Sequence, residues 1–161
     1  MQKTKEDRIN TVMGGGGHVV ILGAGASIAS TLRNSELNGK KLPSMDNFID
    51  IVGLGDIVES IPKQLVAKNF EELYSNLHKV NPESDEIIEM ENRVYRYFSD
   101  MKLPEEPTIY DYIVLSLRSK DLIATFNWDP FLFQALQRNF QVADIPNSAF
   151  LHGSVIILPK N

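Results

Sequence analysis

Short, continuous runs of apolar residues near both ends of the chain predict β-strands. Residues 18–22 (HVVIL) form a β-branched run bounded by glycines, and residues 121–126 (DLIATF) form a second run. The first run is typical of a strand buried on both faces of a parallel sheet, and the second predicts another buried strand. Residues 149–158 (AFLHGSVIIL) predict a third strand.

Between these runs the spacing of apolar residues predicts helices. Residues 23–34 lead from the first strand into a helix, whereas the polar residues 35–47 predict a loop long enough to be functional. Asn69, followed three residues later by Glu72, forms a capping box at the start of another helix. Further helices are expected at residues 45–54, 69–80, 82–101, 107–120 and 129–139.

This order of elements predicts an α/β protein with a Rossmann-like open parallel sheet. We interpret residues 1–161 as one domain in which a helical insertion spans about residues 46–118. Ligands of such sheets bind at the carboxyl ends of the strands. Three unusual motifs lie at or near such ends, and we therefore expect the functional site there: GAGAS at 23–27, FNWD at 126–129 and HGS at 152–154.

Composition and charge exclude several classes of function. The chain has 161 residues, of which 43% are hydrophobic and 23% charged, enough for one buried core. Its net charge is −5, and no basic cluster exceeds the pair Lys40 and Lys41, which argues against direct nucleic-acid binding. The absence of cysteine excludes disulfides and cysteine-based zinc sites.

No segment predicts a membrane span or a metal site. The longest apolar run is too short for a bilayer, and the first ten residues lack the apolar core of a signal peptide. His18 precedes the first predicted strand, and His78 lies on a helix face with no carboxylate or histidine partner at metal-ligand spacing, so neither supports a metal site. We therefore expect a soluble, cytoplasmic protein without a metal.

The glycine motif is a candidate anion site. Gly23 and Gly25 stand where a strand turns into a helix, so that free N–H groups at the helix start can face a pyrophosphate. The dinucleotide fingerprint G-x-G-x-x-G requires a third glycine where this chain has Ile28, which argues against an ordinary hydride-transferring enzyme. The alternative is a tight turn that binds no ligand.

Polar residues after the second and third predicted strands are candidates for chemistry. Asp129, which precedes Pro130, can simply cap the next helix. The presence of Asn127 is less easily explained by capping, because the following helix needs only one cap and Asp129 can provide it. His152 lies in an apolar run, where a lone histidine is more commonly a buried, hydrogen-bonded structural residue.

Taken in order, VVILGAGASIAS, FNWD and LHGS resemble the signatures of the sirtuin superfamily. Those signatures are a Gly-Ala-Gly-x-Ser loop, a Gln-Asn-x-Asp segment and a His-Gly-Ser/Thr segment. The chain is more similar to the sirtuin-like domains of prokaryotic antiphage defence proteins, which cleave NAD, than to the protein deacylases. A further similarity lies in NFEELYSNL, which resembles a helix with an acidic position in those domains.

The resemblance implies a role for each matched residue. Asn127 lies at the catalytic asparagine of the family, and His152 at its catalytic histidine, the general base. Asp129 matches the aspartate that holds the nicotinamide amide. The loop around the phosphates and ribose of NAD is matched by Gly23, Ala24, Gly25, Ala26 and Ser27.

These residue types suit the cleavage of a nicotinamide–ribose bond. That reaction passes through an oxocarbenium-like state, as glycoside cleavage does. A neutral imidazole with a pKa of about 6.5 can take up the proton of a water or ribose hydroxyl. An asparagine can position either group without adding charge.

The chain also departs from the family pattern. Phe126 replaces the glutamine of the second motif, and no arginine follows Pro43 in the loop after the glycine motif. Without cysteines the chain cannot carry the four-cysteine zinc module of the deacylases. Only nine residues follow His152, and the later strands of the family are missing. We therefore expect a fragment of a longer protein or a relative truncated after its third recognisable strand.

The first functional hypothesis is a NAD glycohydrolase domain that acts as the effector of a prokaryotic antiphage defence system. NAD is its expected substrate and water its nucleophile, with no metal. We expect its activity to be regulated by assembly into a homo-oligomer or by binding of a regulatory partner protein. The alternative is a non-catalytic module that senses NAD or ADP-ribose, and a third hypothesis is a structural α/β fold.

Overall fold

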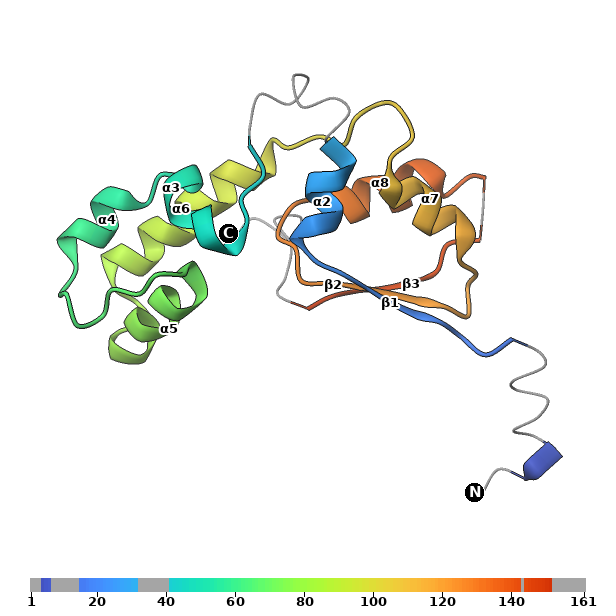
Figure 1. Cartoon of the computed structure of the whole chain (residues 1–161), viewed down its shortest axis with the longest axis horizontal. Helices are drawn as coiled ribbons and strands as arrows, with labels where there is room; N and C mark the ends of the chain where they lie inside the picture. The colour runs from blue at the N-terminus through green and yellow to red at the C-terminus, as the bar shows by residue number, and fades with distance from the viewer. Residues whose placement is uncertain (1–3, 7–14, 32–40, 143, 152–161) are drawn as a thin grey trace.

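The computed structural model describes residues 4–6, 15–31, 41–142 and 144–151. These residues form an α/β protein with a three-stranded, open, parallel sheet and several helices, which confirms the predicted class (Figure 1). The strands lie in the order β1-β2-β3. Their bounds are Val19–Leu22 for β1, Leu122–Thr125 for β2 and Asn147–Phe150 for β3.

The register of the sheet aligns the carboxyl ends of all three strands. Leu22 pairs with Thr125, and Thr125 pairs with Phe150, so each strand ends at the same edge. At the amino ends of the strands, Asp121 holds the segments that precede β1 and β2. Its carboxylate accepts hydrogen bonds from the backbone N–H groups of His18 at 2.7 Å and Arg118 at 2.8 Å. These hydrogen bonds lower the pKa of Asp121 to about 2.

Helices cover one face of the sheet. Figure 1 shows α2 (Ala24–Thr31), α7 (Ile109–Ser116) and α8 (Phe131–Asn139) on the same side of the three strands. Val19 and Ile21 point to the other face, and each is 65% exposed. The prediction that the first strand is buried on both faces is therefore wrong, because the described residues supply only one covering layer.

The third strand also differs from its predicted position. It starts at the polar residue Asn147, two residues before the apolar run, because Asn147 N–H bonds the backbone oxygen of Asp121 beside β2. Pairing with the central strand, rather than hydrophobicity, determines where β3 begins. The remainder of the predicted strand, from residue 152 to 158, lies outside the described residues.

Most of the described residues between α2 and β2 are helical. The predicted cap at Asn69 is confirmed, since the side-chain oxygen of Asn69 accepts the backbone N–H of Glu72 at 2.8 Å. Within the described part of the chain, no helix is both long enough and apolar enough to cross a membrane. Before α7 the elements are η1 (Met45–Asn47), α3 (Phe48–Val52), α4 (Gly55–Ser60), α5 (Phe70–Val80) and α6 (Asp85–Ser99).

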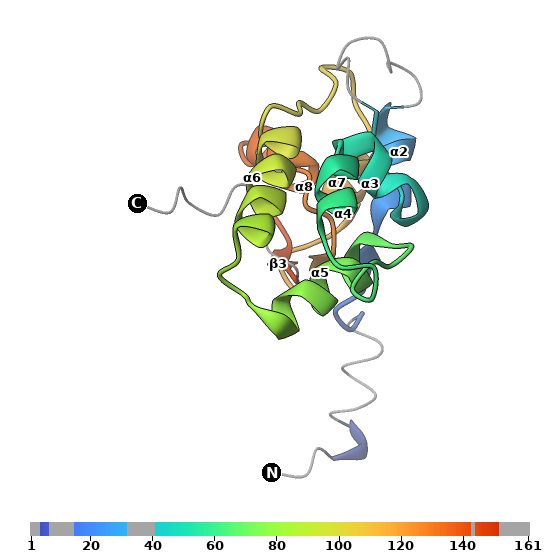
Figure 2. The same ribbon diagram turned by 90° about the vertical axis from the view of Figure 1, so that its left-hand side faces the viewer.

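These helices lie beyond the carboxyl ends of the strands, as the two views in Figures 1 and 2 show for α3 to α6. An aromatic cluster joins them to the sheet. Trp128, just after β2, meets the rings of Phe48 and Phe70 edge-on, with centroids 5.1 and 5.3 Å apart. Aromatic pairs in this geometry contribute more to stability than the burial of their area alone. The cluster therefore holds the helical group against the strand ends.

A buried carboxylate joins α7 to α8. Asp111 accepts hydrogen bonds from the backbone N–H and the hydroxyl of Thr108, from the guanidinium of Arg138 and from the side-chain amide of Asn139. Burial alone would raise the pKa of Asp111, but these donors outweigh it and hold the pKa well below its usual range. The position of α7 over the sheet therefore depends on an ionised Asp111.

Candidate functional site

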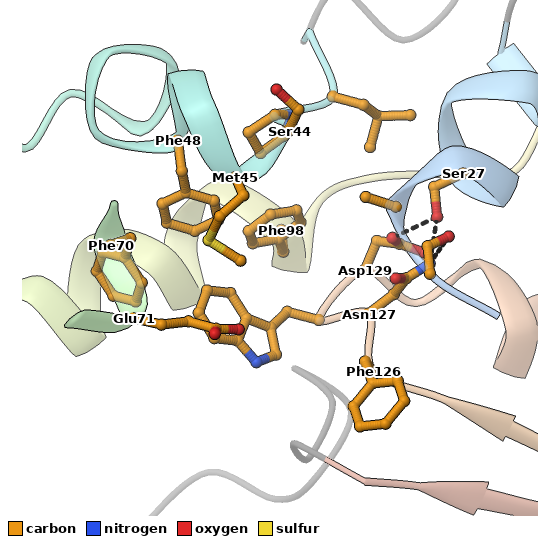
Figure 3. Close-up of a pocket in the computed structure, with 15 residues that line it drawn as sticks. Ser27, Ser44, Met45, Phe48, Phe70, Glu71, Phe98, Phe126, Asn127 and Asp129 are labelled. Carbon is orange, nitrogen blue, oxygen red and sulfur yellow. Dashed lines mark hydrogen bonds between the residues drawn. The ribbon is translucent and has the colours of Figure 1, made fainter. Parts of the chain in front are cut away.

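A pocket of about 140 Å³ lies where the helical group meets the carboxyl ends of β1 and β2 (Figure 3). One side of it comes from the glycine motif and the other from the FNWD segment. The predicted site residues that line this pocket are Gly23, Ala24, Ser27, Asn127 and Asp129. Two motifs that are about 100 residues apart in the sequence thus meet in space, as the convergence of parallel strand ends requires.

Ser27 is the point at which the two motifs join. Its hydroxyl donates to Asp129 Oδ2 at 2.6 Å and lies 2.7 Å from the hydroxyl oxygen of Tyr110. Its oxygen also accepts from the side-chain nitrogen of Asn127 at 2.8 Å. Because Ser27 is only 1% exposed, this network is shielded from water.

The amide nitrogen of Asn127 is engaged in hydrogen bonds within the protein. It donates to the backbone oxygen of Gly23 at 3.0 Å, to Ser27 Oγ at 2.8 Å and to the hydroxyl oxygen of Tyr110 at 3.0 Å. No described residue donates to the amide oxygen of Asn127, and no described side-chain oxygen is both buried and unpaired. Since Asn127 lines the pocket, its oxygen is a hydrogen-bond acceptor available there.

Asp129 accepts a hydrogen bond at each of its two carboxylate oxygens. Its Oδ1 accepts the backbone N–H of Phe131 at 3.2 Å, in the first turn of α8, and its Oδ2 accepts the hydroxyl of Ser27. Burial raises the pKa of Asp129, although the hydrogen bond from Ser27 opposes this shift. A carboxylate has about four acceptor positions, so Asp129 can still accept a hydrogen bond from a ligand.

Tyr110 belongs to the site although the sequence did not indicate it. It lies in α7, is fully buried and bonds both Ser27 and Asn127. Burial, together with the charge of Asp129, raises the pKa of Tyr110, so its hydroxyl keeps its proton. The only available signal was general: a tyrosine inside an apolar helix needs a partner for its hydroxyl.

The far wall of the pocket is apolar and aromatic. Trp128 and Phe126 come from the FNWD segment, and the loop before α3 adds Pro43, which the comparison with the sirtuin motifs had singled out. Figure 3 shows the carboxylate of Glu71, from α5, beside this wall. The remaining apolar wall is formed by Leu42, Met45, Phe48, Phe70 and Phe98.

Two of the described residues that the sequence predicted for the site do not line this pocket. Gly25 does not line it, and a Cβ atom at Gly25 would meet no described atom within 4 Å. Ala26 does not line it either, and packs against the hydrophobic core. His152 lies outside the described residues, so its predicted role stays a prediction.

The site therefore combines a buried carboxylate, a fixed amide oxygen and an aromatic wall. Among the described side chains, no group of three or more histidine, cysteine, aspartate or glutamate residues could hold a metal ion. No protein-family model, no curated protein and no solved structure matches the chain significantly.

Proposed function

We propose that this chain is a sirtuin-like NAD glycohydrolase domain, built on a Rossmann-like sheet, which cleaves the nicotinamide–ribose bond. The observation that carries the proposal is the pocket that both the glycine motif and the FNWD segment line, where Ser27 is hydrogen-bonded to Asn127 and to Asp129. The order of the motifs supports it independently, through their resemblance to the sirtuin superfamily.

The nicotinamide end of NAD suits the pocket described above. Its planar ring matches the aromatic wall around Trp128, and its carboxamide N–H groups can donate to Asp129. The volume of about 140 Å³ is below the range of about 300–1,000 Å³ typical of pockets for larger ligands. The enclosed part thus fits one end of the dinucleotide, and the glycine motif lies beside the ribose and phosphates.

The proposed reaction is a hydrolysis at C1′ of the ribose. The bond between C1′ and the ring nitrogen breaks, and its electron pair neutralises the positive nicotinamide ring. The oxygen of water forms the new bond to C1′, and one water proton passes to the proposed base, His152. The amide oxygen of Asn127 accepts a hydrogen bond from that water or from a ribose hydroxyl, and so orients it.

The test is nicotinamide release from NAD by the longest native chain, compared with its Asn127→Ala variant. Turnover should fall by about a hundredfold or more in this variant. Asn92→Ala removes an exposed asparagine on α6 and is the matched control. Equal turnover of wild type and Asn127→Ala would exclude the proposed site, and tight binding of NAD without nicotinamide release would favour the sensing module instead.

We also propose a cellular role, based on the resemblance of the motifs to the sirtuin-like domains of antiphage defence proteins. The domain acts in the cytoplasm as the effector of an antiphage defence system, held inactive until it assembles or binds a regulatory partner. Bacteria that express the native chain should lose NAD upon phage infection, and bacteria that express Asn127→Ala should not. A constant NAD level in infected cells with an active purified enzyme would remove the defence role and leave the glycohydrolase proposal.

A further inference from the structure

We infer that Tyr110 is a positioning residue, which holds the amide of Asn127 so that its oxygen, and not its nitrogen, faces the pocket. The inference rests on the proposed function for its catalytic consequence, and on hydrogen-bond geometry for its structural part. Tyr110 comes from α7, outside all three sequence motifs.

The directions of the hydrogen bonds follow from counting hydrogens. The Ser27 hydroxyl has one hydrogen and donates it to Asp129 Oδ2. Ser27 can therefore only accept from Tyr110, which in turn spends its single hydrogen on Ser27. The oxygen of Tyr110 is then left as an acceptor for the amide nitrogen of Asn127, 3.0 Å away. The two hydrogens of this nitrogen are shared among Tyr110, Ser27 and the backbone oxygen of Gly23.

This arrangement admits only one orientation of the Asn127 side chain. With the amide rotated by 180°, its oxygen would face the backbone oxygen of Gly23 and two hydroxyl oxygens whose hydrogens are already used. Oxygens without a shared hydrogen repel one another, and a buried acceptor left unpaired is costly. Tyr110 supplies one of the three acceptors that exclude the rotated form.

Complete burial makes this acceptor irreplaceable by water. Tyr110 is 0% exposed, and its ring packs against Phe131 with centroids 6.3 Å apart. Tyr110→Phe keeps that packing and removes only the oxygen. The neighbouring Tyr112, on the same helix, is 61% exposed, so Tyr112→Phe is a matched control that removes a hydroxyl in water.

The decisive measurement is the hydrogen exchange rate of the Asn127 side-chain NH₂ in the full chain, followed by NMR and assigned by its loss in Asn127→Ala. We expect exchange to become about three- to tenfold faster in Tyr110→Phe and to stay unchanged in Tyr112→Phe. The kcat for nicotinamide release should fall by about three- to tenfold in Tyr110→Phe. Its KM should stay within about twofold of the wild-type value, because the binding surface itself is intact.

Unchanged exchange at Asn127 in Tyr110→Phe would overturn the inference, and so would an equal acceleration in Tyr112→Phe. The exchange measurement needs no turnover. A wild-type chain that releases no nicotinamide would therefore refute the proposed function, while the positioning of Asn127 by Tyr110 would still be decided by exchange.

Discussion

The hydroxyl of Ser27 donates a hydrogen bond to Asp129 Oδ2 at 2.6 Å and so joins α2, the helix after β1, to the segment after β2. Both residues are almost fully buried, at 1% and 5% exposure. A buried carboxylate depends on its donors, since water cannot replace them. The bond therefore contributes to the stability of the fold as well as to the shape of the pocket.

Ser27→Ala should lower the free energy of unfolding by about 1–3 kcal/mol, because it removes a donor from a buried carboxylate. Urea unfolding measures the loss. Ser30→Ala is the control: its hydroxyl donates to the backbone oxygen of Ser27 within the same helix, an interaction of little net value. Equal losses in the two variants would contradict a special role for the Ser27–Asp129 bond.

The contribution of Asp129 to stability should fall as pH rises. Because burial raises its pKa, the folded protein keeps the proton over a range in which the unfolded chain, with a pKa of about 3.9, has lost it. Asp129→Asn lacks this titrating group. The free energy of unfolding of Asp129→Asn minus that of wild type should therefore increase from about pH 3 upward and then level off.

Urea unfolding of both proteins across this pH range measures the difference, in which all other titrating groups cancel. The exposed Asp46 provides the control variant, Asp46→Asn. A difference between Asp129→Asn and wild type that stays constant with pH would show that burial does not govern this carboxyl group.

The contribution of Asp111 should have the opposite sign. Its pKa is held below the usual range, so its stabilising effect is complete above the unfolded pKa of about 3.9 and is lost as pH falls toward the lower folded pKa. Asp111→Asn should cost about 3 kcal/mol at pH 7, because it removes the charge of a buried carboxylate that is paired with the partly exposed Arg138.

The same unfolding measurements, carried into acid, should show the gap between Asp111→Asn and wild type closing. Asp50→Asn, an exposed acid near the start of α3, should differ little from wild type at any pH. A gap of constant size in acid would mean that the charge of Asp111 does not hold α7 to α8.

Gly23→Ala should weaken ligand binding without harming the fold. A Cβ atom at Gly23 meets no described atom within 4 Å, yet Gly23 lines the pocket, so the added methyl group occupies ligand space. We expect affinity for ADP-ribose to fall by about tenfold, or about 1.4 kcal/mol. Trp128, the only tryptophan of the chain, lines the same pocket and reports binding by its fluorescence.

Gly55→Ala is the matched control for this substitution. A Cβ atom added at Gly55 would also meet no described atom within 4 Å, and Gly55 does not line the pocket. Its affinity for ADP-ribose should equal that of wild type. If Gly23→Ala binds as tightly as Gly55→Ala, the ligand does not approach the backbone at Gly23.

Much of the site was predictable because parallel strands place their carboxyl ends at one edge of the sheet. The motifs after the first two apolar runs were therefore expected to meet. The hydrogen bonds that Ser27 accepts from Asn127 and donates to Asp129 show that they do. Tyr110 was not predictable in this way. Its hydroxyl reaches Ser27 only because α7 docks over the sheet, and that docking depends on Asp111 and Arg138, contacts with no local sequence signal.

The sequence by itself determined the α/β class, the first two strands, the cap at Asn69 and the meeting of the glycine motif with the FNWD segment, because these follow from local periodicity and from a general property of parallel sheets. Only the tertiary structure decided that Val19 and Ile21 are exposed, that β3 begins at Asn147, and that the amide of Asn127 has one orientation. Each of these depends on a partner distant in the chain: a covering layer, a neighbouring strand or a buried hydroxyl. Local pattern contains no information about such partners, since packing between distant elements selects them.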